Sequence, residues 1–319
     1  MLKKLRIAII GCKNMGRKHL NCLRNNFYDK VRVVGILNST PESTMKVALE
    51  LEVPPLKNVD DINKRKIDAV IIATPPEYHH NIAKTILKKK IPLLVEKPFA
   101  ETDEQCYELI QLAKKENIPL LVGHTENYNP AVIELKQQLT DGIKSIAVIR
   151  TSNNPGVKKT HIISELMIHD LAIVQSLVAD DWNEARIDKN DKYRWDEHAI
   201  VEMKYNCGTI VRLEALRHPE TELKRQMRII DSKNNIWQIS FMERELRKNG
   251  EVLCSGGDSL QNELRNFIGI LHNEDVPLVK AEEARQIVGL CNELETIYKN
   301  PQKNTLNSCI NKISSLYKD

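Results

Sequence analysis

The chain has 319 residues, of which 41% are hydrophobic and 28% are charged, a composition that excludes a disordered protein. Its 47 basic and 43 acidic residues leave a net charge of +4, a balance too even to indicate binding to nucleic acid. No segment approaches the roughly 20 apolar residues that cross a bilayer, so we expect no membrane association, and the length favours two domains.

The first part of the sequence alternates apolar strands with helices. The expected strands are 6–10, 31–37, 68–73, 92–96 and 119–122, and the expected helices are 15–24, 43–52, 78–89 and 103–116. Continuous apolar strands that alternate with helices are typical of a parallel sheet covered on both faces. We therefore predict an α/β, doubly wound Rossmann domain over residues 1–124, which binds a dinucleotide.

Beyond residue 124 the pattern changes to successive strands with turns between them. The expected strands are 145–151, 198–205, 209–216, 226–231 and 236–241, and the expected helices are 164–178, 259–271 and 282–298, followed by a short helix after Asn300. This order predicts an α+β domain over residues 125–319, with a mostly antiparallel sheet, for substrate binding and oligomerisation.

Seven cysteines are scattered without a C-x-x-C pair or a histidine cluster at metal spacing. They indicate free thiols in a reducing compartment, and no metal site is expected. The basic start resembles a signal peptide in charge, but its apolar run ends at Gly11 without a small-residue cleavage site. We therefore read this segment as the first strand and expect a cytoplasmic protein.

The first strand runs directly into a glycine-rich turn, which consists of Gly11, Cys12, Lys13, Asn14, Met15 and Gly16. In the usual G-x-G-x-x-G pattern the first glycine makes the turn, the second admits the pyrophosphate and the third lets the helix pack. Lys13 replaces the second glycine, and it either crowds the pyrophosphate or adds a cation beside it. The turn alone is common in α/β proteins, yet it predicts cofactor binding by Gly11, Lys13, Asn14, Met15 and Gly16.

The second strand ends at Asn38, the position that holds the ribose in this fold. Asparagine can form a hydrogen bond but carries no charge that would repel a 2′-phosphate. No arginine follows in Ser39-Thr40-Pro41 to select that phosphate. NAD is therefore the expected cofactor, and NADP is not excluded.

Four segments in order resemble the Gfo/Idh/MocA family of sugar and inositol oxidoreductases, and nearly the whole chain aligns with it. They are Gly11 to His19, Ala73-Thr74-Pro75 with His79, Glu96-Lys97-Pro98 and Ile168-His169-Asp170. The resemblance implies an NAD(P)-dependent dehydrogenase, active as a homodimer or homotetramer. It extends the cofactor site to Asn38, Ser39, Thr74, Pro75, His79, Glu96, Lys97 and His124.

The same resemblance implies three catalytic residues. Lys97 donates to the oxygen of the reacting alcohol or ketone, and the peptide before Pro98 is commonly cis in the family. His169 is the general base, for which an ordinary pKa of about 6.5 is well suited. Glu165, one helical turn earlier, orients His169 or accepts a substrate hydroxyl; family members usually carry Asp there. Read without the resemblance, Lys97 is a solvated loop lysine and His169 a histidine bonded within its helix.

A fifth segment, Val122 to Val132, is similar to a stretch of UDP-N-acetylglucosamine 3-dehydrogenases, which implies a nucleotide-linked N-acetyl sugar as substrate. Asn127 stands where that stretch has arginine, so a bidentate cation is lost. The other basic residues considered for a diphosphate are Arg150, Lys158 and Lys159. Two alternatives remain open: a dehydrogenase of a free sugar or inositol, and a non-catalytic dinucleotide-binding regulator.

Overall fold

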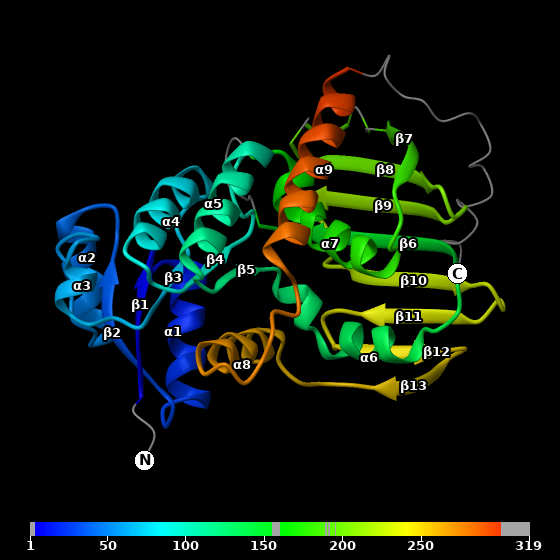
Figure 1. Ribbon diagram of the computed structural model, residues 1–319. Coiled ribbons are helices and arrows are strands. Elements are labelled where there is room, and N and C mark those ends of the chain that lie inside the picture. The colour runs from blue at the N-terminus through cyan, green and yellow to red at the C-terminus, as the bar shows by residue number, and fades with distance from the viewer. Residues whose placement is uncertain (1–3, 155–159, 189, 191, 195, 301–319) are drawn as a thin grey trace. The chain divides into compact units, whose positions relative to one another are not determined.

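A computed structural model describes residues 4–154, 160–188, 190, 192–194 and 196–300 of the protein (Figure 1). The described residues form two compact units, one within 1–125 and 259–288 and the other within 126–258 and 289–319. The predicted division at 124/125 placed residues 259–288 in the second domain, whereas in the structure they pack with the first unit. The predicted helix after Asn300 and the residues Lys158 and Lys159 lie outside the described residues.

The first unit contains a five-stranded parallel sheet of order β2-β1-β3-β4-β5. Its strands are β1 (Leu5–Ile10), β2 (Val31–Leu37), β3 (Ala69–Ile72), β4 (Leu93–Glu96) and β5 (Leu120–Gly123). Its helices are α1 (Asn14–Asn26), α2 (Pro41–Leu51), α3 (Asp61–Lys64), η1 (Pro76–Tyr78), α4 (His79–Lys88), α5 (Asp103–Glu116), α8 (Ser259–Leu271) and the first part of α9 (Ala281–Lys299). The predicted Rossmann fold is confirmed.

Alternate residues of each strand enter two separate apolar layers. Ile7 and Ile9 of β1 pack with residues of α1, α2 and α8, whereas Ala8 and Ile10 pack with residues of α4, α5 and the start of α9. A parallel sheet must be covered on both faces, because neither of its faces is polar. Helix α8 contributes Leu264 and Phe267 to the first layer, which explains why this late segment returns to the first unit.

Capping residues set the helix ends. The Thr102 side chain accepts a hydrogen bond from the backbone N–H of Gln105, and Asn117 ends α5 in the left-handed conformation. The observed bounds of α5 therefore coincide with the predicted 103–116. Thr40 caps α2 and Pro41 occupies its first position, so this helix begins two residues before the predicted start.

The second unit contains an eight-stranded sheet of order β13-β12-β11-β10-β6-β9-β8-β7. Its strands are β6 (Ile143–Ser152), β7 (Trp182–Asp188), β8 (His198–Tyr205), β9 (Ile210–Arg217), β10 (Arg225–Asp231), β11 (Ile236–Ser240), β12 (Glu245–Lys248) and β13 (Glu251–Cys254). Only the β6–β9 pair is parallel among these neighbours, so the mostly antiparallel prediction is confirmed.

Strands β7, β12 and β13 were not predicted. Strands β7 and β13 lie at the two edges of the sheet, and the first three residues of β13 are exposed. An edge strand is paired on one side only and needs no continuous apolar sequence. The Asn249-Gly250 turn between β12 and β13 is nevertheless a recognisable hairpin signal.

Helices cover one face of this sheet (Figure 1). They are η2 (Thr125–Tyr128), α6 (Pro130–Gln138), the π-helical segment η3 (Ile163–Met167), α7 (Ile168–Leu177) and the later part of α9. Helix α6 packs on β11, β12 and β13, and η3 packs on β9. Along β9 alternate residues are buried and half-buried, so the other face of the sheet is partly accessible. Among the described residues, no helix is long and apolar enough to cross a membrane.

Candidate active site

The glycine-rich turn lies where the strand order reverses. Strand β1 has β2 on one side and β3 on the other, and the crevice at the carboxyl ends of such strands is the usual dinucleotide site. Gly11 follows β1 with φ +88°, and a Cβ atom there would lie 2.5 Å from the backbone of Ala73 after β3. A Cβ atom on Gly16 would collide with the backbone oxygen of Gly11. Both glycines are therefore required for this turn to form.

Lys13 adopts φ −100° and ψ −126°, which lies outside the left-handed region that favours glycine. The residue is exposed, and its carbonyl accepts the N–H of Arg17 at 3.0 Å. The backbone therefore tolerates a side chain at this position. Helix α1 begins at Asn14, so the backbone N–H groups of Asn14 and Met15 belong to the first turn, which can bind an anion.

Asn38 ties the glycine-rich turn to the segment after β2. Its Oδ1 accepts the backbone N–H of Cys12 at 2.8 Å, and its Nδ2 donates to the carbonyl of Ser43 at 3.4 Å. Much of its hydrogen-bonding capacity is thus used within the protein. Ser39, the next residue, is exposed, and so is Pro75 after β3.

The Glu96-Lys97-Pro98 segment follows β4, and the Lys97–Pro98 peptide is cis, as the family resemblance implies. Two buried histidines hold it. The Nε2 atom of His19 lies 2.7 Å from Oε1 of Glu96, and the Nδ1 atom of His79 lies 2.8 Å from the carbonyl oxygen of Pro98. The half-buried Lys97 between these contacts lies at the carboxyl edge of the sheet, one strand from β3.

His79 supports this edge of the sheet from within. Its side chain is inaccessible to solvent, and its second ring nitrogen lies 2.8 Å from the carbonyl oxygen of Thr74. Burial lowers the pKa of His79, so the neutral ring donates to one of its two carbonyls at a time. His79 thus holds the segments after β3 and β4, and its assignment to the cofactor site stays a prediction.

Glu96 and His124 are also buried beside Lys97. Burial, followed by the positive charge of Lys97, lowers the pKa of His124 to about 4, so its imidazole is neutral. Neither ring nitrogen of His124 has a hydrogen-bond partner within the described part of the chain. Glu96 and His124 are 6% and 1% exposed, and their assignment to the cofactor site stays a prediction.

Glu165 and His169 come from the second unit. The sequence predicts one α-helix over 164–178, but Glu165 lies in the π-helical segment η3, and α7 begins only at Ile168. Such π-helical turns occur frequently at functional sites. The Glu165 carboxylate forms an ion pair with Arg217 at 2.8 Å, and His169 is half-buried one turn later. The proposed orientation of His169 by Glu165 stays a prediction.

A buried ion pair that the sequence did not reveal lies next to His169. Arg150 of β6 is 1% exposed, and its Nε and Nη2 atoms donate to Asp170 at 2.8 and 2.7 Å. Its Nη1 atom donates to Glu126 at 3.2 Å, and its guanidinium carbon lies 5.1 Å from the centre of the Phe241 ring. The considered role of Arg150 in binding a diphosphate is therefore corrected: its guanidinium is enclosed and holds the start of α7 on β6.

Asn127, the residue in place of the expected arginine, is buried as well. Its side-chain oxygen accepts a hydrogen bond from Nζ of Lys136 at 3.1 Å. Neither Arg150 nor Asn127 therefore presents a positive charge to a substrate. An arginine directly after the apolar run 146–149 is the signal that could have revealed the Arg150 pair, because a buried arginine requires a carboxylate partner.

Residues 5–124 match the model of the Gfo/Idh/MocA family, described as an oxidoreductase family with an NAD-binding Rossmann fold. Among curated proteins, inositol 2-dehydrogenase 2 of Saccharopolyspora erythraea is 26% identical over 189 residues, which cover 56% of this chain and 55% of that protein. Inositol 2-dehydrogenase of Corynebacterium glutamicum is 24% identical over 185 residues, which cover 54% of each. The matches thus span only about half the length of these relatives.

Solved structures match nearly the whole chain. UDP-N-acetylglucosamine 3-dehydrogenase GnnA of Acidithiobacillus ferrooxidans has a TM-score of 0.83 at 23% identity, covering 92% of this chain and 98% of that one. Myo-inositol 2-dehydrogenase of Lactobacillus plantarum has a TM-score of 0.79 at 17% identity, covering 93% and 98%. Biliverdin reductase of Synechocystis sp. PCC 6803, in complex with biliverdin and NADP+, has a TM-score of 0.74 at 17% identity, covering 91% and 98%. At these identities the likeness shows the fold.

Proposed function

We propose that the chain is an NAD(P)-dependent dehydrogenase acting on a secondary hydroxyl of a sugar, because residues 5–124 match the model of the Gfo/Idh/MocA oxidoreductase family. One observation carries the proposal: Lys97 lies at the carboxyl edge of the parallel sheet, in a segment held from both sides by buried histidines. A lysine kept at that edge is suited to act on a bound substrate, whereas a solvated loop lysine needs no such support.

The proposed chemistry divides between the two units. The nicotinamide, when bound, supplies a hydride acceptor for the hydrogen on the reacting carbon. Lys97 donates a hydrogen bond to the reacting oxygen and stabilises the negative charge that develops there. His169 accepts the hydroxyl proton, so the alcohol leaves as a ketone.

The cofactor residues fit a dinucleotide. The required glycines 11 and 16, the exposed Lys13 and the first turn of α1 would hold the pyrophosphate. We propose NAD as the natural cofactor because no arginine follows Asn38, and the uncharged Asn38 leaves NADP possible. Binding titrations with both cofactors test this choice.

For the substrate we propose a nucleotide-linked N-acetyl sugar, based on the resemblance of residues 122–132. A free sugar or inositol is the second candidate, and a specific observation favours it: Arg150 and Asn127 present no cation to a diphosphate. The deciding experiment measures nicotinamide reduction with UDP-N-acetylglucosamine, UDP-glucose, glucose and myo-inositol, with Lys97→Ala as the inactive control. Cofactor binding without turnover on any of them would favour the non-catalytic regulator.

We also propose that the chain forms a homodimer or homotetramer and acts in the cytoplasm. The partly accessible face of the eight-stranded sheet supports an oligomer, and the cysteine pattern supports the location. Light scattering of the purified protein tests the first point: a monomer at working concentration would refute it.

A further inference from the structure

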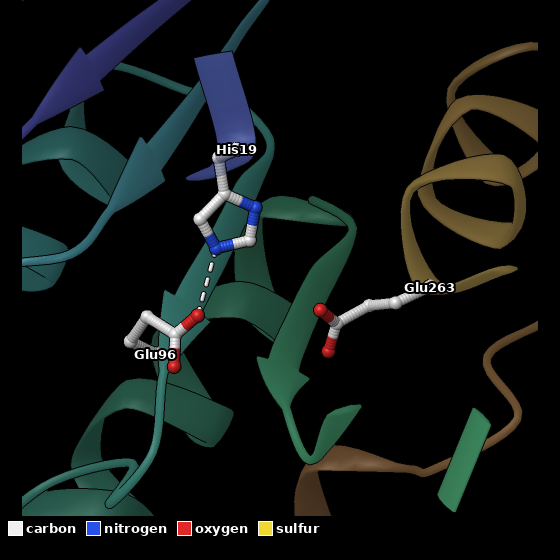
Figure 2. A group of neighbouring side chains, drawn as sticks. All are labelled: His19, Glu96 and Glu263. Carbon is white, nitrogen blue, oxygen red and sulfur yellow. Dashed lines mark hydrogen bonds and ion pairs between the residues drawn. The ribbon is translucent and has the colours of Figure 1, made fainter. Parts of the chain in front are cut away.

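Three buried acid–base residues converge in the first unit, and no step of the proposed reaction uses them (Figure 2). His19 comes from α1, Glu96 is the last residue of β4, and Glu263 comes from α8. His19 and Glu263 are inaccessible to solvent, and Glu96 is 6% exposed. One polar atom from each residue lies within 4.8 Å of the others. Because two carboxylates and an imidazole lie close together and away from water, each must be either neutral or paired with an opposite charge within the group.

The hydrogen bonds indicate which carboxylate carries the charge. Glu96 is central, because its Oε1 lies 2.7 Å from Nε2 of His19 and its Oε2 accepts the backbone N–H of Lys97 at 3.3 Å. An ionised carboxylate can only accept, so the Nε2 atom of His19 is the donor. Burial disfavours the charged form, but the bond from His19 and then the charges of His19 and Lys97 lower the pKa of Glu96. Glu96 is therefore the ionised member.

Glu263 is placed differently. Its Oε2 is bonded to the Thr125 hydroxyl at 3.1 Å, and its Oε1 has no hydrogen-bond partner within the described part of the chain. The charged or titratable groups around it are His19, Glu96 and, beyond Glu96, Lys97 and His124. Burial, followed by the negative charge of Glu96, raises the pKa of Glu263 well above its ordinary value. A second negative charge here would have no cation of its own, so Glu263 retains its proton.

We infer that His19 and Glu96 form a positioning set for Lys97, in which Glu96 is ionised, and that the neighbouring Glu263 is protonated and neutral. His19 holds the Glu96 carboxylate, and that carboxylate in turn holds the backbone N–H of Lys97. His19 lies on α1, and this helix begins at the glycine-rich turn. The set therefore connects the helix proposed to bind the cofactor with the proposed catalytic residue Lys97. The role of Lys97 in this inference rests on the proposed function, whereas the protonation of Glu263 does not.

A divalent cation is the competing explanation, because one imidazole and two carboxylates are common metal ligands. The 2.7 Å hydrogen bond already joins one nitrogen of His19 to an oxygen of Glu96, and a protonated Glu263 is a poor ligand. Elemental analysis of the purified protein separates the two readings. The inference would be overturned if the protein contained a stoichiometric amount of metal and if a chelator removed this metal and lowered the melting temperature.

The kinetic test uses variants at the two carboxylates, which the inference places in opposite states. Glu263→Gln replaces a neutral acid with a neutral amide, so kcat is expected to stay within about threefold of the wild type. Glu96→Gln removes the charge that holds His19 and Lys97, and kcat is expected to fall at least about tenfold while the KM for the cofactor changes little. His19→Leu should match Glu96→Gln, and His19→Gln, which keeps a donor, should recover part of the loss. Equal losses in Glu263→Gln and Glu96→Gln would refute the set.

Two further readouts do not depend on turnover. At neutral pH the wild type should show the infrared carbonyl band of a protonated carboxylic acid, and Glu263→Gln should lack it. If no substrate is turned over, the proposed function fails, but this band still decides the protonation of Glu263. A crystal structure of His19→Leu then decides the positioning: Lys97 displaced from its wild-type place supports the set, and Lys97 unmoved refutes it.

Discussion

Removing the Arg150 guanidinium should destabilise the second unit strongly, because it leaves the buried Asp170 carboxylate and the half-buried Glu126 carboxylate without this cation. Arg150 donates to the buried Asp170 at 2.8 and 2.7 Å and to the half-buried Glu126 at 3.2 Å. Each hydrogen bond to a charged group contributes about 1.5 to 3 kcal/mol, and breaking a buried ion pair by removing one partner costs about 3 to 5 kcal/mol. We expect Arg150→Met to lower the free energy of unfolding by about 4 kcal/mol. Asp170→Asn, which leaves Arg150 paired with Glu126, should cost roughly half as much.

Tryptophan fluorescence during urea unfolding is the suitable assay. Trp182 and Trp237 belong to the second unit, so the tryptophan signal reports the unfolding of that unit. Lys233→Met is the matched control, because Lys233 pairs with Asp141 on the surface and the loss of that pair should be too small to measure.

The pH dependence gives the sharper test. Burial already raises the pKa of Asp170, and Arg150 partly offsets this effect. Without Arg150 the folded-state pKa of Asp170 rises further, so the folded variant takes up a proton at a pH at which the unfolded chain does not. The free energy of unfolding that Arg150→Met loses above the raised folded-state pKa of Asp170 is therefore regained as the pH falls through that pKa. The deficit of Arg150→Met should therefore be smaller at about pH 5.5 than at about pH 8. An equal deficit at both values, or one below about 1 kcal/mol, would refute the buried-charge reasoning.

Three other predictions concern the candidate site. Lys97→Ala and His169→Ala should each lower kcat by two orders of magnitude or more, a loss of about 2.7 to 4 kcal/mol, with NAD binding almost unchanged; steady-state kinetics with near-normal turnover would overturn the assignment. Because Asn38 neither repels nor pairs with a 2′-phosphate, calorimetric titrations should show less than about a hundredfold discrimination between NAD and NADP, or roughly 2.7 kcal/mol. Lys13→Gly should change NAD affinity by less than about tenfold, or roughly 1.4 kcal/mol, because Lys13 is exposed with ordinary dihedrals; a much larger gain in the same titration would show that the lysine obstructs the site.

The local structure of the first unit followed from the sequence because its signals are local. The apolar runs at 6–10 and 31–37 indicated strands buried on both faces, and the predicted helix 103–116 coincides with α5, which Thr102 caps and Asn117 ends. The glycine-rich turn was recognisable because Gly11 needs a left-handed conformation. Each of these features depends only on residues that are close together in the sequence, so the sequence alone is sufficient to predict it.

Only the tertiary structure decided which side chains meet. His19 and Glu96 are separated by 77 positions and Arg150 and Asp170 by 20, and no periodicity in the sequence links either pair. The return of α8 to the first unit likewise depends on an apolar layer that the sheet leaves open for Leu264 and Phe267. A buried charge needs a partner, but which residue supplies it is set by how distant segments pack, and this is why the supports behind Lys97 and His169 were visible only in the folded chain.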